Sequence, residues 1–107
     1  DSSAAHILAY QDTHCIGTGR LVNLSDKQAQ IGRMAVLAQF REKGVGKQIL
    51  QKLVDLAASQ GAREIILHSQ VSAIPFYEKL GFQAQGDVYD EAGIPHRNMI
   101  LTLANSD

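Results

Sequence analysis

The spacing of apolar residues changes near the middle of the chain, from short strand-like segments to a helical period. Residues 6–10, 15–24 and 30–37 are short segments rich in apolar and β-branched side chains, and polar turns separate them. We predict a strand in each, and the short connections predict antiparallel pairing. Gly17 and Gly19 interrupt the second segment, and they predict a bulge or a close neighbour at that point.

After Gly46 the apolar period becomes 3.6 residues. This period predicts an amphipathic helix from Lys47 to Ser59, with Gly61 as its C-terminal stop. The apolar segment 64–68 then predicts a buried strand. A strand, a helix and a strand over this length predict a right-handed parallel crossover.

The last third of the chain predicts a second helix and a hairpin. Ser72 is the expected N-cap of this helix, Pro75 fits its first turn, and Leu80-Gly81 are expected to end it. Residues 83–89 and 96–103 predict two strands joined by a turn at 90–93. The whole pattern predicts an α/β fold.

Residues 41–46, Arg-Glu-Lys-Gly-Val-Gly, connect the third strand to the first helix. Glycines let the backbone turn tightly, and the first turn of a helix offers unpaired N–H groups to an anion. The Walker pattern GxxxxGK[ST] fails, because Arg41 and Gln48 stand at its first glycine and its Ser/Thr position. The dinucleotide pattern GxGxxG fails at Ile49. The pattern Arg-x-x-Gly-x-Gly remains.

This pattern resembles the coenzyme A pyrophosphate loop of the GNAT family of N-acetyltransferases, Gln/Arg-x-x-Gly-x-Gly/Ala. Residues 76–82, Phe-Tyr-Glu-Lys-Leu-Gly-Phe, resemble a phrase in a later helix of that family, and residues 93–96 followed by Met99 resemble its ElaA-like branch. The resemblance covers about residues 6–103. It implies a GNAT-like mixed sheet, with antiparallel hairpins, a central parallel crossover and packed helices, and acetyl-coenzyme A as co-substrate.

The resemblance also implies roles for individual residues. The glycine loop would hold the pyrophosphate, and the strand before it would offer backbone N–H groups to the thioester and the pantetheine arm. Tyr77 matches the family tyrosine that protonates the departing thiolate. Glu42 stands where the family often has glycine, and its charge is expected to lower cofactor affinity modestly. The residues expected to contact the cofactor are Met34, Val36, Arg41, Lys43, Gly44, Val45, Gly46 and Lys47.

The acceptor amine needs a base. An alkyl ammonium with a pKa of ~10.4 costs about 4–5 kcal/mol to deprotonate at pH 7. His96 is the candidate base, because imidazole titrates near neutral pH, and a purely structural role is the alternative. Asp90 and Glu91 are predicted in the neighbouring turn, where carboxylates are usually solvated, and His68 is a candidate wall residue. The remaining histidines and Cys15 lack metal-ligand spacing, so no metal site is predicted.

Length and composition set the outer bounds. A chain of 107 residues and 11.6 kDa predicts one domain, over residues 1–107. The net charge of −1 gives no indication of nucleic-acid binding, and no apolar run approaches the ~20 residues that span a membrane. The single cysteine excludes an intrachain disulfide and fits a reducing compartment, so a cytoplasmic location is expected.

The family fold normally begins with a strand and two helices that we do not find here. We therefore expect an N-terminally incomplete domain with apolar surface that a second copy, another polypeptide or a further segment would cover. The predicted reaction is direct transfer of acetyl to a primary amine of a small molecule or peptide, because no serine or cysteine stands in a nucleophile setting. The alternatives are a non-catalytic acyl-coenzyme A binding or regulatory module and, less favoured, a binder of another phosphate ligand.

Overall fold

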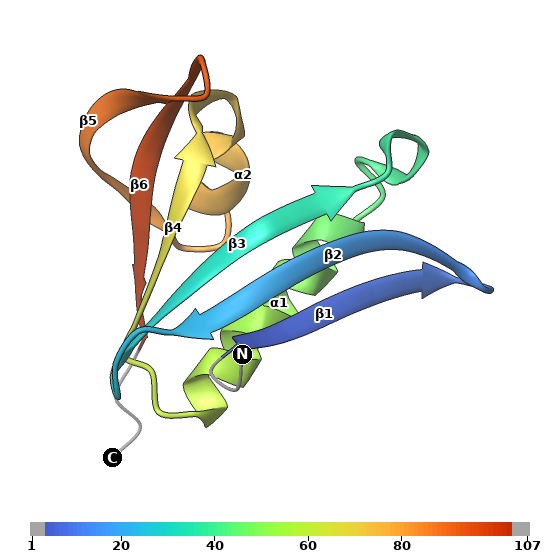
Figure 1. Ribbon diagram of the computed structural model, residues 1–107, viewed down its shortest axis with the longest axis horizontal. Helices are drawn as coiled ribbons and strands as arrows, with labels where there is room; N and C mark the ends of the chain where they lie inside the picture. The colour runs from blue at the N-terminus through green and yellow to red at the C-terminus, as the bar shows by residue number, and fades with distance from the viewer. Residues whose placement is uncertain (1–3, 104–107) are drawn as a thin grey trace.

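Six strands form one mixed sheet in the computed structural model, which describes residues 4–103 (Figure 1). The strand order is β1-β2-β3-β4-β6-β5. β4 runs parallel to β3, and every other neighbouring pair is antiparallel, as the sequence predicts. The strands are β1 (Ala4–Gln11), β2 (His14–Asn23), β3 (Gln28–Val36), β4 (Glu64–Gln70), β5 (Gln83–Glu91) and β6 (Ile94–Thr102).

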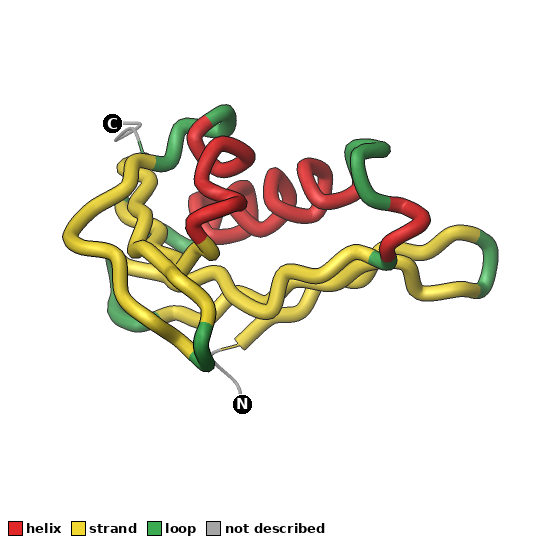
Figure 2. The backbone as a smooth tube through the Cα atoms, turned by 90° about the horizontal axis from the view of Figure 1, so that it is seen from above, coloured by secondary structure: helices red, strands yellow, loops and turns green. Residues whose placement is uncertain are grey.

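Two α-helices lie on one side of this sheet, α1 (Val45–Ser59) and α2 (Ile74–Glu78) (Figure 2). Short 3-10 turns precede each of them, η1 (Ala38–Phe40) and η2 (Val71–Ala73). α1 begins two residues before the predicted start and ends where predicted. The predicted cap Ser72 is wrong: it lies inside η2, so Ala73 is the N-cap residue of α2 and makes no side-chain capping bond.

The core lies between α1 and the helix-facing side of the sheet. Gly17 and Gly19 allow this close packing, because a Cβ on Gly19 would lie 2.7 Å from Leu53 Cδ1 and 2.8 Å from Ile49 Cγ2. The register between β2 and β3 also shifts in this region. The predicted bulge and the predicted close neighbour are therefore both present. The stripe of α1 that is fully buried here consists of Ile49, Leu50, Leu53 and Ala57.

β3 and β4 pair only over residues 28–30 and 64–66, and beyond these residues they diverge (Figure 1). The later part of β3 therefore has a neighbouring strand on its β2 side only. Leu37 N–H donates to the Ile16 carbonyl on β2 at 2.9 Å. In a strand, the N–H and C=O of one residue point to the same side, and successive residues alternate between the two sides. Since Leu37 faces β2, the preceding residue Val36 directs its N–H and C=O to the open side of β3.

The last hairpin is longer than predicted. β5 extends to Glu91 and β6 begins at Ile94, so only Ala92 and Gly93 form the turn. Their φ angles, 53° and 80°, are the positive values that a two-residue hairpin turn requires. The prediction of a turn over 90–93 is therefore wrong for Asp90 and Glu91, which belong to a strand. Each of these two side chains is therefore directed to one face of the sheet.

Apolar side chains are exposed on β1. Leu8 and Tyr10 are 51% and 59% exposed, whereas the alternate residues Ile7 and Ala9 pack against the core. The strand thus has one face against α1 and one face open to solvent. That a second copy or another segment covers this apolar surface stays a prediction.

Candidate functional site

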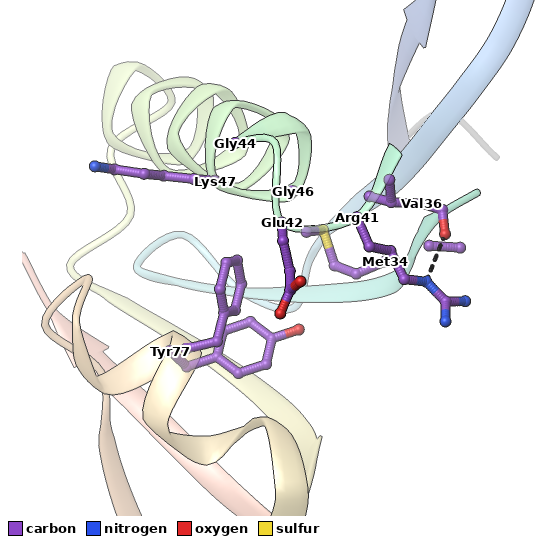
Figure 3. A pocket seen from close by; sticks show the side chains of 10 residues that line it. Met34, Val36, Arg41, Glu42, Gly44, Gly46, Lys47 and Tyr77 are labelled. Atoms are coloured by element: carbon purple, nitrogen blue, oxygen red, sulfur yellow. Dashed lines mark hydrogen bonds between the residues drawn. The ribbon is translucent and has the colours of Figure 1, made fainter. Parts of the chain in front are cut away.

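Two cavities of ≈ 330 Å³ each lie next to each other on the open side of β3. We name the first the loop cavity, because β3, the loop after it, the first turn of α1 and α2 form its wall (Figure 3). We name the second the wedge cavity, because it lies between the diverging strands β3 and β4. The loop cavity is lined by Met34, Ala35, Val36, Arg41, Glu42, Gly44, Gly46, Lys47, Phe76 and Tyr77.

The start of α1 borders the loop cavity and presents the features that suit an anion. Gly44 is the N-cap residue, with a left-handed φ of 85° that favours glycine. No side chain caps the helix and its first turn contains no acidic residue. The first intrahelical bond is donated by Gln48 N–H to the Gly44 carbonyl, at 3.0 Å. Within residues 4–103, the N–H groups of the preceding turn, at 45–47, are thus left without a hydrogen-bond partner.

The charged side chains of the loop point in different directions. Arg41 Nε donates to the Val36 carbonyl at 3.0 Å, which holds the guanidinium at the end of β3 (Figure 3). Lys47 extends from the first turn of α1, whereas Glu42 hangs from the loop between the helix and Tyr77 (Figure 3). Among residues 4–103, Glu42 is the one carboxylate that lines the loop cavity. The predicted cofactor contacts Lys43 and Val45 do not line the cavity with the others.

Tyr77 stands where the two cavities meet. Its ring packs edge-on against Phe76 and Phe82, with centroid distances of 5.0 and 6.0 Å. Burial raises the pKa of the Tyr77 phenol above its ordinary value of about 10, so the hydroxyl keeps its proton at neutral pH. Tyr77 and Met34 both line the two cavities.

The wedge cavity is more polar. Arg33 reaches it from β3, where its φ of 53° is a strained, left-handed value for a residue with a side chain. Besides Arg33, the titratable residues that line the wedge cavity are Tyr77 and two histidines. In the described part of the chain, no carboxylate is among its lining residues. The lining consists of Ile31, Gly32, Arg33, Met34, Leu67, His68, Ser69, Gln70, Ala73, Tyr77 and His96.

His96 is 8% exposed, and both of its ring nitrogens have oxygen neighbours. Nδ1 lies 2.8 Å from the Ile94 carbonyl oxygen, so this nitrogen carries a proton and donates it. Nε2 lies 3.5 Å from Glu91 Oε2. The other carboxylate oxygen, Oε1, lies 3.8 Å from Nδ1 of His68. Sequence reasoning missed this arrangement, because it placed Glu91 in a turn.

No metal centre is evident among residues 4–103, which contain no cluster of three or more His, Cys, Asp or Glu side chains able to hold an ion. None of the helices over the same residues is long and apolar enough to cross a membrane.

The family model for the acetyltransferase (GNAT) domain matches residues 1–103. The chain belongs to the GNAT family. Acetyl-coenzyme A is the co-substrate of this family. The resemblance drawn from the glycine loop and from residues 76–82 is therefore confirmed, and so is the GNAT-like fold.

Similarity to individual proteins of known sequence or structure supports membership of the GNAT family. The uncharacterised protein YyaT of Bacillus subtilis is 36% identical over 101 residues, which are 94% of this chain and 68% of YyaT. The uncharacterised N-acetyltransferase YjcF of the same organism is 35% identical over 94% of this chain and 71% of its own length. The crystal structure of Escherichia coli ElaA matches with a TM-score of 0.83 and 26% identity, over 92% of this chain and 68% of ElaA.

Proposed function

We propose that this protein transfers acetyl from acetyl-coenzyme A directly to a primary amine of a small molecule or peptide. The observation that carries the proposal is the meeting of the two cavities at Met34 and Tyr77. One cavity is suited to a phosphate-bearing donor and the other is suited to an acceptor. A thioester carbonyl at their junction would be open to attack from the wedge cavity.

The donor would lie along the open side of β3. Its pyrophosphate would accept hydrogen bonds from the N–H groups of the first turn of α1, where the helix dipole adds positive potential. The amides of the pantetheine arm would pair with the outward-facing backbone of Val36 and with the backbone of Met34, as the family resemblance implies. A preorganised N–H aimed at the developing oxyanion contributes ~3 kcal/mol to transition-state stabilisation. The Glu42 carboxylate opposes the phosphate charge, and we expect it to lower the affinity.

Direct transfer is favoured over a covalent acetyl-enzyme. Over the described residues, the two cavity linings contain no cysteine, and their one serine is Ser69. Ser69 is 1% exposed, and its hydroxyl donates to the Gln70 carbonyl at 2.7 Å. Within the part of the chain that the structure describes, neither histidine of the wedge cavity is hydrogen-bonded to Ser69. Ser69 therefore lacks the adjacent base that activates a serine nucleophile.

The test is release of coenzyme A thiol with a panel of amines, followed by the mass of the acetylated product. Acetyl-coenzyme A binding should be measured in parallel by calorimetry, with ATP as the competing phosphate ligand. Binding together with amine-dependent thiol release would support the proposal. Binding without release for any amine would favour the non-catalytic acyl-coenzyme A binding module, and preference for ATP would contradict both.

Replacing Tyr77 by Phe is expected to lower turnover by about 10- to 100-fold while leaving cofactor affinity nearly unchanged. The ring packing against Phe76 and Phe82 is kept and only the proton donor is lost. The effect is limited because a thiol with a pKa of ~8.5 is already a fair leaving group. Steady-state kinetics and calorimetry of the same preparation measure the two quantities.

The pH profile provides the control for this prediction. Burial raises the pKa of Tyr77 above its ordinary value of about 10, so the wild-type phenol stays protonated between pH 7 and about 9. Deprotonation of Tyr77 should therefore cause no loss of turnover in that range. Equal turnover of wild type and Tyr77→Phe at every pH would show that Tyr77 is a packing residue only.

A further inference from the structure

A carboxylate joins two histidines at one end of the wedge cavity. Glu91 Oε1 lies 3.8 Å from His68 Nδ1, and Glu91 Oε2 lies 3.5 Å from His96 Nε2. The three residues come from the neighbouring strands β4, β5 and β6. Tyr89 packs against both imidazole rings, edge-on to His68 and stacked on His96, each with a centroid distance of 6.1 Å. Both histidines line the wedge cavity, whereas Glu91 stands behind them.

The two histidines differ in which nitrogen remains available. In His96, Nδ1 donates to the Ile94 carbonyl and Nε2 faces the Glu91 carboxylate, so neither nitrogen is directed to an acceptor substrate. In His68, Nδ1 faces the same carboxylate and Nε2 has no hydrogen-bond partner among residues 4–103. The side chain of His68 is also 42% exposed, against 10% for His96.

We infer that His68 is the base that removes the proton from the acceptor ammonium, with Glu91 as its positioning residue. A carboxylate that faces Nδ1 favours the tautomer in which Nδ1 carries the proton and Nε2 can accept one, and it stabilises the imidazolium that forms. His96 lies beside the other oxygen of Glu91, at 3.5 Å, and is itself anchored on the Ile94 carbonyl, so it bounds the position of the carboxylate. This inference rests on the proposed acetyltransferase function and replaces His96 by His68 in the role of base.

The transfer of acetyl to the amine moves protons and electron pairs as follows. Nε2 of His68 takes one proton from the ammonium, and the freed nitrogen lone pair forms a bond to the thioester carbonyl carbon. The carbonyl π pair moves to oxygen and returns when the carbon–sulfur bond breaks. The nitrogen loses its second proton to solvent as the amide forms, while Tyr77 gives its proton to the sulfur and regains one from solvent. The proton on His68 leaves to solvent, so one ammonium yields one amide, one thiol and one free proton.

Other charged and titratable groups face the same cavity and bear on its pH dependence. On β3, Arg33 places a positive charge on the far wall, which disfavours a second cation there. Tyr77 on α2 is neutral at ordinary pH because burial raises its pKa. Within residues 4–103, Glu91 is thus the only carboxylate that lies within 4 Å of a ring nitrogen of either histidine, at 3.8 Å from His68 and 3.5 Å from His96. Glu91 and Tyr89 contact His68 directly, and the charged or titratable groups that line the wedge cavity with it are Arg33, Tyr77 and His96.

The decisive experiment compares two acceptors in the His68→Asn variant and the wild type. The first is an alkylamine, which is an ammonium at pH 7, and the second is an arylamine, which is already neutral there. For the alkylamine we expect the variant's kcat/KM to fall by about 100-fold or more relative to wild type. For the arylamine we expect the ratio of variant to wild type to stay near one. As the pH approaches the pKa of the alkylamine, its deficit should shrink.

Two further variants separate the roles. Glu91→Gln should give a partial loss with the same dependence on the acceptor, because the neutral amide orients His68 without stabilising its cation. His14→Asn is the matched control: this exposed histidine on β2 lines neither cavity and should behave as wild type.

Several outcomes would overturn the inference. Equal losses for the two acceptors would show that His68 is structural. Full alkylamine activity in His68→Asn, with that activity lost in His96→Asn, would return the role of base to His96. If the wild type itself releases no coenzyme A with any amine, the proposed function falls and this inference falls with it.

Discussion

The Gly46→Val variant is expected to fold normally and to bind acetyl-coenzyme A about 100-fold more weakly. A Cβ at this position would lie 3.6 Å from Phe76 Cζ and 3.7 Å from Val36 Cγ2, which are ordinary contacts. The two γ-methyl groups of valine extend further, into the mouth of the loop cavity, and would keep the pyrophosphate from the N–H groups of the helix. Losing one or two charge-assisted hydrogen bonds, each worth ~1.5–3 kcal/mol, corresponds to a loss of this size. Calorimetric titration measures it.

The Gly46→Ala variant is the matched control for this prediction. It adds only the Cβ, for which the cavity has room, so we expect a much smaller change in affinity. The circular dichroism spectra and thermal unfolding of both variants should resemble those of wild type. Unchanged affinity in a folded Gly46→Val protein would remove the glycine loop from the cofactor site.

The Leu53→Ala variant is expected to lower the free energy of unfolding by about 2–5 kcal/mol. Leu53 is fully buried on α1 and lies above Gly19, so its removal leaves a cavity between the helix and the sheet. Domains of this kind are stable by only ~5–15 kcal/mol, so the loss would be a large part of the total. Denaturant unfolding followed by circular dichroism gives the value.

The neighbouring Lys52→Ala variant serves as the comparison. Lys52 is exposed on the same helix, and its replacement should change the free energy of unfolding by no more than about 0.5 kcal/mol. Similar effects of the two substitutions would mean that α1 does not pack on β2 through this stripe.

The spacing of apolar residues correctly predicted the helices and strands that have one clearly buried face. The helix of residues 47–59 and the strand of 64–68 are each determined by one apolar pattern that leaves little alternative. Ser72 was mistaken for a cap because a 3-10 turn, η2, intervenes before α2, and single residues do not distinguish that turn from the start of the helix. Capping depends on backbone geometry at one residue, which the period of a segment does not determine.

The prediction of where the last turn lies was wrong for a different reason. Asp90, Glu91, Ala92 and Gly93 are all compatible with a turn, and the choice among them depends on the register between β5 and β6. That register is in turn linked to the pairing of β6 with β4, a contact between segments distant in sequence. Local residue preferences do not contain this information.

The sequence pointed to the parts of the candidate site that lie within one short segment, and it did not point to the parts that come from distant segments. The glycine loop and Tyr77 belong to short contiguous phrases, so a resemblance could point to them. The His68–Glu91–His96 arrangement requires three strands in their final register, and no segment of the sequence contains it. Which of the two histidines has an available nitrogen could be seen only when the partners of each ring were known.

The divergence of β3 from β4 has a mechanical consequence. It divides the sheet into a half formed by β1, β2 and β3 and a half formed by β4, β6 and β5, joined at one end by the short pairing of residues 28–30 with 64–66. A ligand with amide groups that enters this gap would serve as a missing strand and hold the two halves at a fixed angle. Because such a ligand binds only the folded sheet, its binding energy would add to the stability of the fold. Cofactor binding and sheet cohesion would then be the same interaction.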